Sequence, residues 1–78
     1  MTENEKYVHA FVETFQIKQE ETINLEYQSI AEWDSIGHMT LITELEDAFN
    51  ITMDTDDIID FSSFEKGKEI LRKYDVEL

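Results

Sequence analysis

The chain contains no cysteine and no proline, and only two of its 78 residues are glycine. Without cysteine there are no disulfides and no thiolate metal sites, and the polypeptide has no thiol of its own for thioester chemistry. The lack of proline and the scarcity of glycine favour helices over a succession of tight hairpin turns. We expect one small domain, residues 1–78, that depends on a single hydrophobic core.

Basic residues are also scarce: six Lys and Arg stand against 19 Asp and Glu, for a net charge of −13. This balance argues against nucleic-acid binding, which needs a basic surface. It favours steered association with basic protein surfaces, although surplus acid can also simply keep a small domain in solution. Because 41% of the residues are apolar, the chain is not a disordered acidic tail.

Long apolar runs are absent as well. No stretch has the length of a membrane span, and residues 1–20 lack the basic start and apolar block of a secretory signal. We therefore expect a cytoplasmic, monomeric protein that does not associate with membranes.

The first helix is predicted over residues 2–16. Thr2 and Glu5 have the spacing of a capping box at its start. The apolar stripe consists of Val8, Phe11, Val12 and Phe15, flanked by Tyr7. In residues 17–34 the apolar positions alternate without helical period, which predicts a long loop anchored to the core by Ile23 and Leu25.

A second helix is predicted over residues 35–50. Leu41, Leu45 and Phe49 recur every four residues, and Asp34 or Ser35 can cap the start. A short helix follows at residues 54–61, and Ser62 and Glu65 then form a capping box for a last helix. Its stripe consists of Phe64, Gly67, Ile70, Leu71 and Tyr74. The fold class is all-α: a small four-helix bundle with a long loop between helices 1 and 2.

Ser35 is the most informative residue, because it lies where the loop turns into the second helix. Unsatisfied N–H groups and a partial positive charge at a helix N-terminus hold a phosphate well. A serine before an apolar helix can equally be a plain N-cap. The surrounding pattern decides between these interpretations.

The segment Asp34-Ser35-Ile36, followed by the apolar repeat of the helix and by residues 45–51 (LEDAFNI), resembles the acyl carrier proteins. The resemblance covers essentially the whole chain. It implies that a phosphopantetheinyl transferase, using coenzyme A and magnesium, attaches 4′-phosphopantetheine to the Ser35 hydroxyl. The thiol of that arm would carry acyl groups as thioesters, and the chain itself would not be an enzyme.

The resemblance also implies partner-binding residues. Asp34, Ile36 and Met39 would contact the transferase and partner enzymes beside the arm, and Glu44, Glu46 and Asp47 would dock on basic docking surfaces of acyl-transferring or acyl-modifying enzymes. Each has a plainer interpretation: Asp34 also caps the helix, Ile36 and Met39 can pack in the core, and the acids can be a solvated face.

Gly37, His38 and Thr40 depart from the acidic or small polar residues usual in the family. This favours a specialised pathway, such as secondary metabolism or surface-glycan modification, over bulk fatty acid biosynthesis. His38 lies one turn from Ser35, but no third orienting group accompanies the pair, so a hydrolase is disfavoured. We expect His38 to contact a partner or to be exposed, and His9 to be structural.

The acidic run from Asp54 to Asp60 does not match a calcium loop, because Ile58 and Ile59 stand where a ligand and a glycine are required. No metal site is expected. Chain length and the absence of linkers favour a free-standing carrier over a module of a larger synthase. An aminoacyl or peptidyl carrier is the nearest alternative, and an unmodified acidic protein-interaction module is the alternative from another class.

Overall fold

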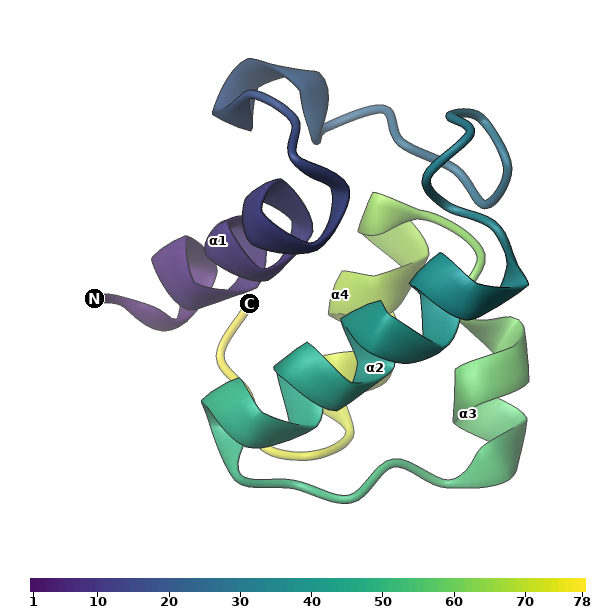
Figure 1. Cartoon of the computed structure of the whole chain (residues 1–78). Coiled ribbons are helices and arrows are strands. Elements are labelled where there is room, and N and C mark those ends of the chain that lie inside the picture. The colour runs from purple at the N-terminus through teal and green to yellow at the C-terminus, as the bar shows by residue number, and fades with distance from the viewer.

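The structure, a computed structural model that describes all 78 residues, contains helices and no strands, with 59% of the residues helical. Four α-helices and one 3₁₀ turn follow in the order α1 (Glu3–Phe15), η1 (Gln19–Glu21), α2 (Ser35–Phe49), α3 (Thr55–Asp60) and α4 (Phe64–Arg72). Figure 1 shows this arrangement, in which α1 and α2 pack against each other. The predicted all-α class, with three longer helices and one short helix, is confirmed.

Helix α1 begins with the predicted capping box. The Glu5 amide donates to Thr2 Oγ1 at 3.1 Å, and the Thr2 amide donates to the Glu5 carboxylate at 2.9 Å. The buried face differs from the predicted stripe, because Tyr7, Ala10, Phe11 and Phe15 are buried while Val8 and Val12 are only partly buried. Tyr7 therefore belongs to the core, where its hydroxyl donates to the Phe64 carbonyl at 2.6 Å and burial raises its pKa.

The long connection between α1 and α2 is confirmed, and one of its two predicted anchors is wrong. Leu25 is buried as expected, but Ile23 is 60% exposed. Thr22 takes the inward position instead, with its hydroxyl bonded to the Gln19 carbonyl at 2.8 Å. A buried hydroxyl needs a partner, and the η1 turn supplies one locally. Trp33, at the end of the loop, is fully buried.

The loop is fastened to the start of α4 by an antiparallel bridge between Glu26 and Ser63. The Tyr27 amide donates to the Ser62 carbonyl, and the Phe64 amide donates to the Leu25 carbonyl, both at 2.9 Å. The predicted capping role of Ser62 is wrong: Ser63 caps α4, accepting the Lys66 amide at 2.9 Å. The bridge fixes the backbone of Ser62 one residue before the N-cap, outside the helix.

Helix α2 runs as predicted from Ser35 and ends before Asn50, which adopts the left-handed conformation at φ 54°. Asparagine tolerates this conformation at the end of a helix better than most residues. Leu41, Ile42 and Leu45 form the buried face of α2. The Glu77 amide donates to the Glu3 carboxylate, so the C-terminal segment lies beside α1 (Figure 1).

Helix α3 is joined to the C-terminal end of α4 by one buried acid. Asp57 accepts hydrogen bonds from the Lys73 ammonium and from the Tyr74 hydroxyl, each at 2.5 Å. The same Tyr74 hydroxyl accepts the Asp54 amide at 2.9 Å. The bond from Lys73, followed by that from Tyr74, lowers the pKa of Asp57 below its usual value. These contacts hold a helix too short to be stable alone.

One hydrophobic core joins the four α-helices and the long loop, and it is rich in aromatic rings. The Phe11 ring contacts those of Phe15, Trp33, Phe61 and Phe64, with ring centroids 5.0 to 6.2 Å apart. Trp33 thus brings the end of the loop, immediately before Ser35, into the centre of the core. None of the helices has both the length and the apolar character that crossing a bilayer requires.

Candidate functional site

Ser35 is the first residue of α2 and its side chain is exposed. Asp34 is the N-cap: its carboxylate accepts the Gly37 amide at 2.8 Å, and its carbonyl accepts the His38 amide at 2.8 Å. The amides of Ser35 and Ile36 donate no hydrogen bond within the chain. Two N–H groups at the positive end of the helix are therefore free beside the serine hydroxyl.

Gly37 allows the loop to pass unusually close to the first turn of α2. A Cβ atom at this position would lie 2.0 Å from the Glu32 carbonyl oxygen and 3.3 Å from the Phe15 ring. Because the nearest atom belongs to the backbone, a side chain here would force the loop and the helix apart. Glycine at this position thus sets the path of the chain that leads to Ser35.

His38 is partly buried and held by both nitrogens of its ring, so the prediction of an exposed side chain is wrong, while a contact of His38 with a partner stays a prediction. Nδ1 accepts the Trp33 indole N–H at 2.9 Å, and Nε2 lies 2.8 Å from the Ile58 carbonyl oxygen. Since Nδ1 is an acceptor here, Nε2 carries the proton and donates it to Ile58. Neither nitrogen is bonded to the Ser35 hydroxyl.

Aromatic rings surround the imidazole of His38. It stacks on Trp33, with centroids 6.2 Å apart and planes at 15°, and meets Tyr27 and Phe61 edge-on at 5.4 and 6.1 Å. The ring therefore connects three segments, because Tyr27 belongs to the loop, His38 to α2 and Phe61 to the end of α3.

An apolar cavity of about 340 Å³ opens beside Ser35. Met39 and Ile59 line it and are largely exposed, so it is open to solvent between α2 and α3. His38 and the buried Phe61 form its inner side. Its complete lining comprises Tyr27, Ser35, His38, Met39, Ile58, Ile59, Phe61 and Ser62.

Two of the predicted partner-binding residues form an exposed apolar surface next to Ser35. Ile36 is 77% exposed and Met39 is 49% exposed, so neither belongs to the core. The backbone carbonyls of these two residues accept the hydroxyls of Thr40 and Thr43, one turn further along α2. Asp34 is exposed beside them, although its carboxylate is engaged as the helix cap.

The acidic residues of α2 do not all have the same environment. Glu44 and Asp47 are exposed, whereas Glu46 is partly buried and accepts the Met53 amide at 2.9 Å. Glu46 therefore helps to fix the turn that follows α2, and only Glu44 and Asp47 present their carboxylates freely to solvent.

Comparison of the chain with protein-family models, with curated proteins and with solved structures finds no match. The chemistry of the site therefore follows from its own geometry and charge. The arrangement offers an exposed hydroxyl, two free amides at a helix N-terminus and an apolar cavity. These features suit a group that is anionic where it meets the serine and apolar further away.

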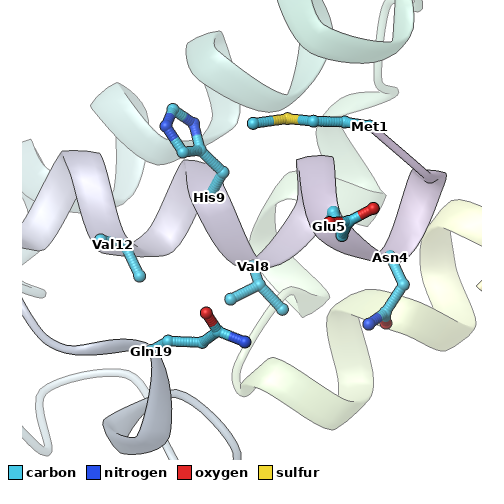
Figure 2. A pocket seen from close by; sticks show the side chains of 7 residues that line it. All are labelled: Met1, Asn4, Glu5, Val8, His9, Val12 and Gln19. Atoms are coloured by element: carbon cyan, nitrogen blue, oxygen red, sulfur yellow. The ribbon is translucent and has the colours of Figure 1, made fainter.

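A second cavity, of about 210 Å³, lies along the outer side of α1 and shares no lining residue with the cavity beside Ser35. Figure 2 shows Gln19 of η1 next to Val8 of α1, with His9 and Met1 on the other side of the helix. His9 is exposed and its imidazole lies 3.5 Å from the Glu13 carboxylate one turn away. No group of three or more His, Asp or Glu side chains is placed to hold a metal ion.

Sequence reasoning missed the roles of Gly37 and His38, although a signal for His38 was present. His38, Leu41, Ile42 and Leu45 have the spacing of one helix face, so His38 continues the buried face of α2. No comparable signal existed for Tyr27, Ile58 or Phe61, because the loop and α3 come together with α2 only in the folded chain.

Proposed function

We propose that this chain is an acyl carrier protein whose Ser35 hydroxyl is esterified by 4′-phosphopantetheine. The observation that carries the proposal is the exposed Ser35 at the start of α2, with two free amides beside it and an apolar cavity next to it. The resemblance of the segment around Asp34-Ser35-Ile36 to the acyl carrier proteins points to the same residue. A four-helix-bundle arrangement of α1–α4 is part of this proposal.

The residues around Ser35 fit a phosphodiester. Its negative charge suits the helix N-terminus, where the Ser35 and Ile36 amides have no other acceptor. In the attachment reaction, the Ser35 oxygen bonds to the phosphorus of coenzyme A nearest the pantetheine, adenosine 3′,5′-bisphosphate leaves, and the hydroxyl proton passes to the transferase or to water. The attached arm supplies the thiol that the cysteine-free chain lacks, and thereby a thioester linkage to cargo.

The surface around Ser35 suits enzymes with basic docking surfaces. Glu44 and Asp47 offer free carboxylates, and Ile36 and Met39 offer apolar contact area beside the serine. Charge of one sign speeds the encounter with a basic partner, while the apolar contacts prolong the complex. We propose the phosphopantetheinyl transferase and acyl-transferring or acyl-modifying enzymes of the cytoplasm as these partners, in a specialised pathway.

Two other functions compete with this one. An aminoacyl or peptidyl carrier would use Ser35 and the arm in the same way with different cargo. An unmodified acidic interaction module is favoured by the exposed Ile36 and Met39 beside acidic side chains, because such a surface can bind a basic partner without any modification.

Intact-mass spectrometry before and after treatment with a phosphopantetheinyl transferase, coenzyme A and magnesium tests the proposal. We expect a gain of one phosphopantetheine in the wild type and in Ser62→Ala, and none in Ser35→Ala. Ser62 is a matched control because it is an exposed serine that lines the same cavity. Protein shown to be unmodified at the start that gains nothing with several transferases of different breadth would favour the interaction module instead.

A further inference from the structure

One of the two side chains on the inner side of the cavity beside Ser35, that of His38, is held through both of its ring nitrogens. The His38 ring lines the cavity on one side, and on the other it bonds to Trp33, which is fully buried and does not line the cavity. Its second nitrogen bonds to the Ile58 carbonyl of α3. The imidazole therefore lies between the open cavity and the aromatic core.

A chain that entered the core on the Trp33 side of this cavity would have to displace His38. The displacement would break the bond to Ile58 and leave the Trp33 indole N–H, at the centre of the core, without an acceptor. Leaving a buried donor unsatisfied is costly. The contacts of the ring with Trp33, Tyr27 and Phe61 would also be lost. No such cost applies to a group that stops within the open cavity.

We propose that His38 is a specificity-determining residue: it closes the core to the group carried on Ser35 and so limits stable burial to short acyl groups. This inference rests on the proposed function, because it concerns cargo attached through the phosphopantetheine arm. The arm is flexible, so its acyl end can fold back to the cavity beside its own attachment point. A short chain fits outside the His38 ring, whereas the distal part of a long chain stays in solvent.

The test uses the full chain loaded at Ser35 with butyryl, octanoyl or dodecanoyl phosphopantetheine, with loading confirmed by intact mass. Each methylene that becomes buried should raise the melting temperature by about 3 °C or more. In the wild type we expect the rise to stop once the cavity is filled, so that the dodecanoyl form melts no higher than the octanoyl form. In His38→Ala, where the inner side of the cavity is open, we expect the melting temperature to rise with chain length.

Two variants control for other effects of the substitution. His38→Gln keeps an acceptor for Trp33 and a donor for Ile58, so it should behave as the wild type. His9→Ala removes the other histidine, which is exposed on α1, and should also leave the length dependence unchanged.

The single tryptophan gives a readout that does not depend on the stability of any variant. The Trp33 indole N–H resonance of the wild type reports its bond to His38, and we expect it to keep its position and slow hydrogen exchange in the dodecanoyl form. If His38→Ala does not fold, the position and the hydrogen exchange of this resonance in the wild type still test the inference.

The inference is overturned if the dodecanoyl form of the wild type melts well above the octanoyl form, or if its indole resonance moves or exchanges faster. It is also overturned if the melting temperature of a folded His38→Ala stops rising at octanoyl, as that of the wild type is expected to do. A chain that never gains phosphopantetheine in the mass spectrum instead contradicts the proposed function, so the two failures are distinguishable.

Discussion

At the scale of single residues, the path of the chain into Ser35 depends on a position where a side chain cannot be accommodated. Gly37 lies against the Glu32 carbonyl, and Trp33, four residues before it, is fixed in the core. The close approach at Gly37 and the burial of Trp33 thus hold the loop against the first turn of α2. Asp34, between them, completes the turn as the N-cap. The exposed position of Ser35 follows from how these three neighbours are held.

Gly37→Ala tests this account, because helix propensity and the close contact predict opposite changes in the free energy of unfolding. Helix propensity alone predicts that alanine stabilises α2 by about 1 kcal/mol over glycine. The contact with the Glu32 backbone predicts the opposite, because overpacking costs about 1–3 kcal/mol. We expect the variant to lose up to about 2 kcal/mol of unfolding free energy in urea denaturation, the clash being larger than the propensity gain.

Ile36→Ala is the matched control for this experiment. It lies one residue earlier in the same turn, its side chain is largely exposed, and alanine improves helix propensity there too. We expect its stability to stay within about 0.5 kcal/mol of the wild type. A stabilised Gly37→Ala would mean that the loop can move away from the helix without cost.

At the scale of helices, the short α3 depends on a contact with α4. Asp57 is the only acid that is buried, and its two hydrogen-bond donors, Lys73 and Tyr74, come from the end of α4 and the residues after it. Ile58, the next residue, offers its carbonyl to His38 of α2. Helix α3 is therefore connected both to the end of α4 and to the site beside Ser35.

The depressed pKa of Asp57 predicts a pH-dependent contribution to stability. The bond from Lys73, then that from Tyr74, lowers this pKa in the folded chain, while an Asp in the unfolded chain titrates near about 3.9. The carboxylate thus stabilises the fold fully at neutral pH, and this contribution is lost as the pH falls through the lower, folded-state pKa. Asp57→Asn should melt several degrees below the wild type at neutral pH, and the difference should narrow progressively below about pH 4.

Asp56→Asn serves as the control, because it removes one negative charge from the same turn at an exposed residue. Thermal melts of the three proteins, followed by circular dichroism across this pH range, make the comparison. A difference between Asp57→Asn and the wild type that stays constant down to pH 2 would show that the carboxylate charge is not what stabilises α3.

At the scale of the whole molecule, the charge of −13 on 78 residues opposes folding through self-repulsion. Only one Lys–carboxylate ion pair, Lys73 with Asp57, offsets this repulsion. Salt screens charges at the surface over distances of about 10 Å at 0.1 M. The repulsion is therefore weaker at higher ionic strength.

We expect added sodium chloride to raise the melting temperature, and magnesium to raise it further at matched ionic strength. Magnesium can associate weakly with neighbouring carboxylates even without a defined site, and any cation that favours the folded chain stabilises it. Differential scanning fluorimetry in both salts measures the effect. A melting temperature that does not change with ionic strength would contradict this account of the charge.

The sequence by itself determined the helices and the position of Ser35 at the start of α2. Local physics governs these features: the Thr2–Glu5 capping box, the acid before the serine and the apolar repeat of α2 act within a few residues of one another. The long connection was also predictable, because an alternating apolar pattern does not form a helix. The identity of the group on Ser35 remains a prediction from the resemblance.

Only the tertiary structure decided which side chains are buried and which surround Ser35. Ile23 is exposed although it is apolar, because η1 turns Thr22 inward, and Ser62 lies outside α4 because a bridge to the loop fixes its backbone. His38 is fixed in place because Trp33 and Ile58, from the loop and α3, supply the two partners that its ring requires. Those partners lie on other segments, so their meeting depends on how the helices pack, which no local pattern specifies.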